Sequence, residues 1–246
     1  MKRELVWDLP VRLFHALLAT SFFAAFGIAQ LVDDDSTLFT VHMLLGALMA
    51  IMVLLRLLWG LWGSKYARLT TFMFGPTAVV SYLKSVMNKP ESHIGHNPGS
   101  SLAIWAIFGL ALGMLTTGLL MSTNEIFEEL HEVLAYSFLA VVVVHVAGVL
   151  WHVAKTKQNI ILSMVDGKKE IAAHDAIPTM HPGVAVLFLT ITAASAATLV
   201  NGFDAGTKTF TVPGLGSQIR VGEAEGGGEH QNNSGARDRD GDDDDD

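Results

Sequence analysis

Five long runs of apolar residues dominate the hydrophobic pattern of the chain. They cover about residues 11–32, 41–63, 101–122, 127–153 and 183–200. A helix needs about 20 such residues to cross the hydrocarbon core of a bilayer, and each run comes near that length, the fifth being the shortest. The pattern therefore predicts an all-α membrane protein, with a four-helix transmembrane bundle and a fifth transmembrane helix.

One further segment carries apolar residues in an interrupted run, and the first of the five long runs needs a check against a secretory signal. The run at residues 72–87 is too short and too interrupted to span, so we expect a helix lying at the membrane interface. At the N-terminus, the apolar run from Leu13 to Val32 exceeds the core of a usual secretory signal. We therefore expect a first membrane helix that is retained.

The segments between the apolar runs alternate in charge. Lys and Arg occur in residues 1–12 and in the long connections 64–100 and 154–182, whereas the short connections 33–40 and 122–129 carry only acidic charges. Basic residues favour the cytoplasmic side of a membrane. We therefore expect a multi-pass protein of the bacterial inner membrane with a cytoplasmic N-terminus and a periplasmic C-terminal tail. All five tryptophans fall at helix ends on the predicted cytoplasmic side, as expected for an interfacial belt.

Composition narrows the kinds of redox centre that the chain can hold. It has no cysteine, which excludes c-type haem attachment, cysteine-ligated iron–sulfur clusters and disulfides within the chain. The net charge of −8 lies mostly in residues 201–246, which carry eleven acidic and four basic side chains. We predict that this tail is disordered, and divide the chain into a membrane domain (1–170), a fifth helix (183–200) and the tail (201–246). No basic stripe with interleaved aromatics is present, so no nucleic-acid partner is expected.

Histidines within the apolar runs provide the candidate chemistry. His131 and His145 are fourteen residues apart, which places them on nearly the same helix face and about 21 Å apart along the axis. The predicted crossing directions place His15 at the depth of His145, and His42 at the depth of His131. Ionisable groups at such depths are costly and mark paths for ions, protons or electrons. Because neutral imidazoles are good axial ligands of haem iron, the four histidines predict two stacked bis-His haem sites.

Each of these histidines, taken alone, is also compatible with a core residue hydrogen-bonded to a neighbouring helix. Four histidines at two matched depths favour haem instead. Arg56 follows His42 by fourteen residues, so it shares that face at the inner level, where it either pairs with haem propionates or extends to lipid headgroups. For His152, an interfacial surface position is favoured over contact with a propionate or a quinone. The remaining histidines lie in predicted loops or the tail and form no spaced metal motif: His93, His96, His174, His181 and His230.

Four segments, in order, resemble a known family. VWDLPVRLFHALL (6–18), the run from His42 to Gly63, GHNP (95–98) and HEVLAYSFLAVVVVH (131–145) are similar to bacterial cytochrome b561 proteins, including b-type cytochrome subunits of nickel–iron hydrogenases. The resemblance covers roughly residues 4–170. It implies a four-helix bundle holding two b haems, with the ligand positions at His15, His42, His131 and His145.

The resemblance also implies a role and partners. Similar proteins pass electrons between the quinone pool and a periplasmic hydrogenase or c-type cytochrome, and the fifth apolar run suggests one of these two branches. The acidic extension from residue 201 matches no family motif. We thus expect an electron-transfer subunit without acid–base catalytic residues of its own. The alternatives are a histidine-lined metal or proton transporter, for which few intramembrane carboxylates are present, and a non-redox membrane anchor.

Overall fold

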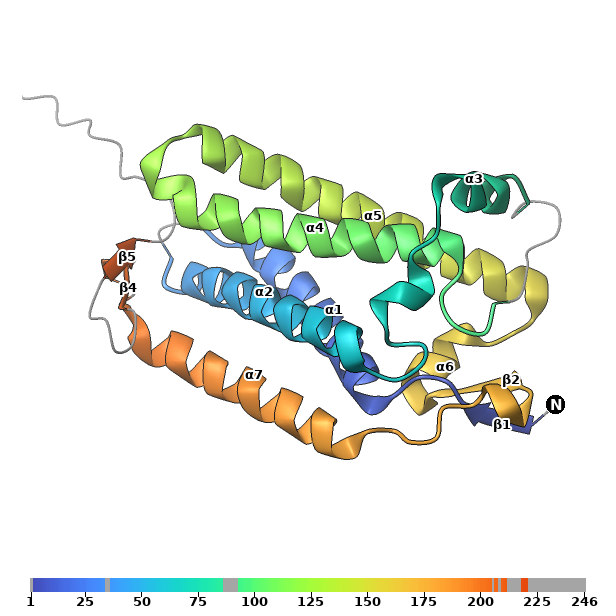
Figure 1. Ribbon diagram of the computed structural model, residues 1–246. Coiled ribbons are helices and arrows are strands. Elements are labelled where there is room, and N and C mark those ends of the chain that lie inside the picture. Colours follow the sequence, from blue (N-terminus) through green and yellow to red (C-terminus); the bar gives the residue numbers. More distant parts are fainter. Residues whose placement is uncertain are drawn as a thin grey trace, which may run out of the picture.

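Five long helices form the body of the protein (Figure 1). The computed structural model describes residues 2–33, 36–85, 93–204, 206–207, 209–211 and 218–220. The long helices are α1 (Leu9–Leu31), α2 (Phe39–Trp62), α4 (Pro98–Leu120), α5 (Ile126–Thr156) and α7 (Pro182–Gly202). All five are long and apolar enough to span a membrane. The predicted all-α membrane architecture is confirmed.

Shorter helices join the long ones. They are α3 (Pro76–Ser85) and α6 (Ile160–Asp166), with 3-10 turns at Leu69–Phe72, Met121–Thr123 and Ala173–Asp175. Helix α3 falls within the segment 72–87 for which the sequence predicts a short helix, although residues 86–87 lie outside the described part of the chain. Its expected position at a membrane interface stays a prediction.

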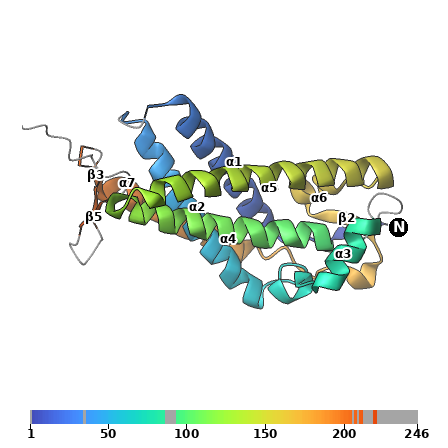
Figure 2. The same ribbon diagram turned by 90° about the horizontal axis from the view of Figure 1, so that it is seen from above.

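The long helices are arranged as two antiparallel pairs with α7 on the outside. Helix α1 packs along α2, and α4 packs along α5. Contacts between α2 and α4 join the pairs, and α7 lies against α2 and α1 (Figures 1 and 2). The core between them is apolar and contains Phe14, Leu18, Phe22, Met49, Met52, Val53, Phe108, Ala111, Phe138 and Phe188. The arrangement sets α1 and α2 opposite α5 across the bundle.

A buried carboxylate fixes the start of α1. Asp8 is fully buried, and its Oδ1 accepts a hydrogen bond from the backbone N–H of Val11 at 3.0 Å, which caps the helix. Its Oδ2 accepts hydrogen bonds from the Trp59 indole N–H at 3.0 Å and from the Ser64 hydroxyl. Trp59 lies in the last turn of α2 and Ser64 just beyond it. Asp8 therefore ties the beginning of α1 to the end of α2.

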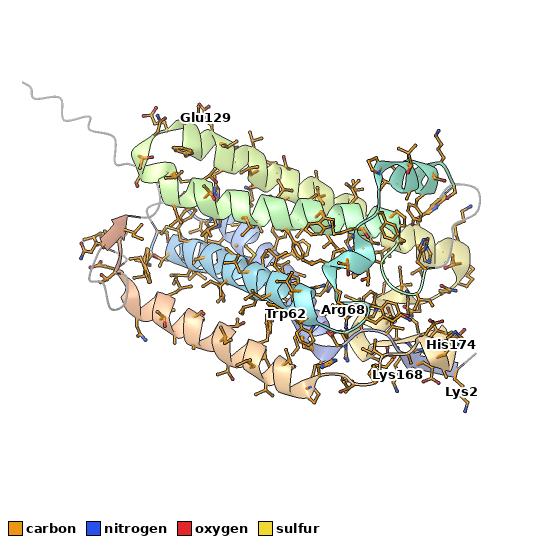
Figure 3. All side chains as sticks on the ribbon, in the orientation of Figure 1. Lys2, Trp62, Arg68, Glu129, Lys168 and His174 are labelled. Carbon is orange, nitrogen blue, oxygen red and sulfur yellow. The ribbon has the colours of Figure 1, made fainter. Side chains whose placement is uncertain are left out.

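A two-stranded sheet closes the same end of the molecule, which the sequence analysis did not predict. Strand β1 (Lys2–Leu5) pairs antiparallel with β2 (Lys168–Ile171). Gly167 has φ of 82°, a conformation that favours glycine, and its carbonyl accepts the N–H groups of Val6 and Trp7. Lys2 and Lys168 thus lie at the opposite end of the bundle from Glu129 (Figure 3). The separation of charge agrees with the predicted segregation of basic and acidic connections.

A second sheet follows α7 at the other end of the bundle. Its strands are β3 (Phe203–Asp204), β4 (Thr209–Thr211) and β5 (Gln218–Arg220), all antiparallel. We name these three strands the C-terminal sheet. The sequence predicts disorder from residue 201 onward, whereas these strands are folded, because short alternating segments such as Thr209–Thr211 pair with one another. The acidic block 221–246 lies outside the described residues, as do Asp34, Asp35 and Lys89.

Candidate functional site

Two of the four predicted histidines meet between α2 and α5. The ring centroids of His42 and His131 are 6.3 Å apart, and the ring planes are inclined by 70°. Two metal–imidazole bonds of about 2 Å each, together with the distance from each ring centre to its nitrogen, add up to roughly this separation. The pair therefore fits one metal ion held between two imidazoles, as in a bis-His haem.

We name His42 and His131 the outer pair after the predicted topology. Hydrogen bonds orient both of its rings. The Nδ1 of His42 lies 2.8 Å from the carbonyl oxygen of Ala25 on α1, which can only accept, so Nδ1 carries the proton. The Nδ1 of His131 lies 2.9 Å from the hydroxyl oxygen of Thr117 on α4. Thr117 donates its own proton to the carbonyl of Gly113 or Met114, each 3.1 Å away, and so accepts from His131. In both rings Nε2 is left with its lone pair, as a metal ligand requires.

A cavity of about 470 Å³ surrounds the outer pair. All four helices of the two pairs contribute to its wall, together with residues near and beyond the end of α7. Most of the lining is apolar, with Phe22, Phe138 and Met49 among the buried members. This volume falls within the range of cofactor sites, which are mostly apolar with a few fixed polar groups.

Two carboxylates belong to the same cavity. Glu128 and Glu132 of α5 contribute to its lining, and both are exposed. Within the described ranges, no three His, Cys, Asp or Glu side chains gather as a metal-ion site. What comes together is two imidazoles in an apolar setting.

The other two histidines, His15 on α1 and His145 on α5, lie close enough to interact electrostatically. A stacked contact between Phe22 of α1 and Phe138 of α5 shows how deep the two histidines lie along the bundle. The centres of the two phenylalanine rings are 4.4 Å apart, and the rings are inclined by 17°. His15 precedes Phe22 by seven residues and His145 follows Phe138 by seven. Because α1 and α5 run in opposite directions, both histidines lie about 10 Å from the stacked pair toward the end that carries β1. His131 precedes Phe138 by seven residues, on the other side of the stack.

Arg56 is buried at the level of His15 and His145, which we name the inner pair after the predicted topology, because it follows His42 by fourteen residues on α2. It is 4% exposed, so the predicted alternative in which it extends to lipid headgroups is wrong. Its Nη2 donates to the carbonyl of Ala67 at 3.0 Å, and its guanidinium lies 5.9 Å from the centre of the Phe72 ring. Nη1 is buried and has no hydrogen-bond partner within the described part of the chain. A buried, unpaired cationic donor calls for an anionic acceptor, and a haem propionate is of that kind.

His96 is a site residue that the sequence analysis missed. Its ring lies 4.7 Å from the ring of Trp7 and 4.7 Å from that of Phe72. Burial, followed by the nearby charges of Arg56, Lys169 and His145, lowers the pKa of His96 to about 3, so the ring is neutral. Its Nδ1 is buried without a partner among the described residues. The position of His96 next to the Asn97 cap of α4 was the available signal, because a helix start in a membrane protein lies at the interface.

Lys169 of β2 holds the loop that contains His96. Its ammonium group donates to the carbonyls of His93 at 3.0 Å and Ile94 at 2.8 Å, and lies 5.9 Å from the centre of the Trp7 ring. Burial lowers the pKa of Lys169 to about 8. The β1–β2 sheet thereby fixes the loop against the inner end of the bundle. We refer to Arg56, His96, His152 and Lys169 as the inner polar cluster.

One further expectation for this end of the molecule is wrong. His152 does not lie at the surface, because it is 5% exposed and its Nδ1 is buried without a partner in the described ranges. The tryptophans differ in burial, and their predicted interfacial belt stays a prediction. Trp7 is buried, with its indole N–H 3.3 Å from the Ser163 hydroxyl, whereas Trp62 is exposed. Burial of His152 and Trp7 arises from the packing of α6 and the β1–β2 sheet, which the hydropathy pattern does not report.

Comparison with known proteins agrees with this arrangement. Residues 6–167 match the family model described as prokaryotic cytochrome b561, which is well over half of the chain. The comparisons with curated proteins and with solved structures gave no match. The matched range spans α1 to α6 and includes all four histidines. The resemblance inferred from the motifs is thus confirmed, and the chain belongs to the prokaryotic cytochrome b561 family of multi-pass membrane b-type cytochromes, which bind haem b and transfer electrons.

Proposed function

We propose that the chain binds two b haems, one between His42 and His131 and one between His15 and His145, and conducts electrons across a bacterial cytoplasmic membrane. The observation that carries the proposal is the outer pair, with its 6.3 Å ring separation and its two Nδ1 hydrogen bonds. Haem iron supplies one-electron transfer when it is bound. The residues of the chain supply axial imidazoles, an apolar wall and fixed hydrogen-bond partners.

The inner polar cluster supports the assignment of the second haem. His96 interacts electrostatically with both Arg56 and His145, and Arg56 has a buried donor that lacks an acceptor within the described ranges. A propionate from a haem at His15 and His145 would satisfy that donor. Desolvated charged pairs of this kind are strong and geometrically specific. Arg56 is therefore proposed to hold and orient the inner haem.

The proposed partners are the quinone pool and a periplasmic c-type cytochrome or hydrogenase. Lys2, Arg68 and Lys168 lie toward the end of the bundle that carries β1, and Glu129 in the first turn of α5 lies at the other end (Figure 3). By the positive-inside rule, the first end faces the cytoplasm. The outer pair then lies on the periplasmic side, within reach of a soluble partner.

Single-histidine variants test the two-haem proposal. We expect His131→Ala and His145→Ala each to retain one haem per chain, while wild type retains two. His174→Ala is the matched control, because that imidazole is 81% exposed in a loop, and it should retain both haems. Haem is counted by pyridine extraction of the purified proteins. Equal haem content in His131→Ala and wild type would overturn the outer assignment, and the same result for His145→Ala would overturn the inner one.

A further inference from the structure

The C-terminal sheet presents a row of three apolar side chains. In its antiparallel register Phe203 lies opposite Phe210, and Phe210 lies opposite Ile219. Residues directly opposite one another on antiparallel strands share a face of the sheet. The three side chains therefore form one continuous apolar row across the sheet. Such a row on a short sheet needs a surface against which to pack.

The row faces the cavity around the outer pair. Phe203, Phe210 and Ile219 all contribute to the lining of the cavity that contains His42 and His131, and Leu199 of α7 contributes beside them. The strands lie at the end of the bundle near the turn from α4 to α5 in both views (Figures 1 and 2). None of these residues falls within the range 6–167 that matches the family.

Close packing holds the sheet against the end of α7. A Cβ added to Gly202, the last residue of α7, would lie 2.7 Å from Cε2 of Phe210 and 3.1 Å from the carbonyl oxygen of Thr211. Only a residue without Cβ allows this approach without a shift of β4. In the following turn, Oδ1 of Asp204 accepts the N–H groups of Gly206 at 2.8 Å and Thr207 at 3.1 Å. The sheet is thus built onto the helix in a defined position.

We propose that the C-terminal sheet is part of the outer cofactor site, with Phe203, Phe210 and Ile219 packing on the edge of a haem held by His42 and His131. This inference rests on the proposed outer haem. Apart from its two propionates, the periphery of a b haem is apolar, so covering that apolar edge with these side chains stabilises the bound haem. The apolar wall also keeps water away from the haem. A drier, less polar setting disfavours the more highly charged ferric form, which raises the reduction potential of the outer haem relative to an open pocket.

Two truncations and a pair of glycine variants test the role of the sheet. A chain that ends after residue 202 should transfer its outer haem to an acceptor protein at a rate at least roughly tenfold higher than wild type. The reduction potential of that haem should also be lower than in wild type. A chain that ends after residue 220 should behave like wild type. Gly202→Ala should shift both properties in the same direction. Gly183→Ala on the same helix is the control, because its added Cβ meets nothing within 4 Å.

The inner haem serves as the internal reference in every sample. An unchanged inner haem, together with a faster-dissociating outer haem in both the 202 truncation and Gly202→Ala, supports the proposal. Equal dissociation rates and potentials in the 202 truncation and wild type would overturn it. Failure of the outer haem itself is distinguishable, because His131→Ala would then leave the haem content unchanged. If the 202 truncation does not fold, Gly202→Ala against Gly183→Ala decides the question in full-length protein.

Discussion

Replacing Thr117 with valine should weaken the outer haem site without removing a ligand. The hydroxyl of Thr117 accepts the Nδ1–H of His131 at 2.9 Å, and valine keeps nearly the same shape without that acceptor. Thr117 is 3% exposed, so water cannot readily replace the lost oxygen. The His131 ring is then free to rotate or to change tautomer, and each change takes Nε2 away from its ligand role.

The size of the effect follows from the hydrogen bond that is lost. A buried donor left without a partner costs about 1–3 kcal/mol. Loss of the group that orients a metal-ligating histidine typically lowers metal affinity about 10- to 100-fold, which corresponds to about 1.4–2.7 kcal/mol. The two estimates agree. The potential of the outer haem should also rise, because an imidazole that no longer donates its Nδ1–H is a weaker base and favours ferric iron less.

The assay is the rate of haem transfer from purified protein to a soluble haem acceptor, with redox titration of the same samples. Thr116→Val is the matched control: the neighbouring Thr116 is exposed, and its hydroxyl donates only to the carbonyl of Leu112 in its own helix, at 2.9 Å. Thr117→Val should lose one of its two haems faster than wild type, and Thr116→Val should not. If the two variants behave alike, the hydrogen bond does not support the His131 ligand and the reasoning fails.

Three further predictions concern other parts of the chain. Asp8→Ala should lower the Tm and destabilise the fold by at least about 2 kcal/mol, since it leaves the N-terminal cap, the partly buried Trp59 donor and the buried Ser64 donor without an acceptor; a Tm equal to wild type would contradict this. The pKa of His96 falls from 6.5 to about 3 on burial, so neutral His96 favours the fold above pH 6.5 and this contribution is lost as pH falls toward 3. The Tm should therefore decrease as the pH is lowered from 6.5 toward 3, and it should decrease less steeply in His96→Phe. Equal slopes in the two proteins would refute the lowered pKa of His96. Deletion of residues 226–246 should leave two haems per chain by pyridine extraction, because a polar, highly charged segment adds nothing to the apolar core, and haem loss would show that the tail is structural.

The spanning helices and the outer histidine pair could be predicted because both follow from helix periodicity and membrane thickness. The spacing of His131 and His145 on one helix, combined with alternating loop charges, was enough to pair His42 with His131, and the structure brings these two together. The sequence also predicts that His15 and His145 lie at a common depth. The stacked contact between Phe22 and Phe138, each seven residues from one of these histidines, supports this prediction.

Contacts between segments distant in sequence could not be predicted in the same way. Thr117 and Ala25 orient the outer histidines across helix interfaces, and no periodicity identifies such partners. His96 lies in a loop as predicted, but that loop is held by Lys169 of β2, so the His96 ring packs against Trp7 and Phe72. His152 was assigned to the surface, whereas the structure buries it. The C-terminal sheet was missed because its strands are two or three residues long and lie next to a strongly acidic segment, which made the composition resemble a disordered tail.

The most direct test of the account is the number and ligation of haems in the purified wild-type chain. A reduced-minus-oxidised visible spectrum, with haem counted by pyridine extraction, should give two non-covalent b haems per chain with low-spin bis-His bands. One haem or none, after expression with an adequate haem supply, would contradict two stacked haem sites. The four histidines would then have to be explained as structural residues or as part of a metal or proton path.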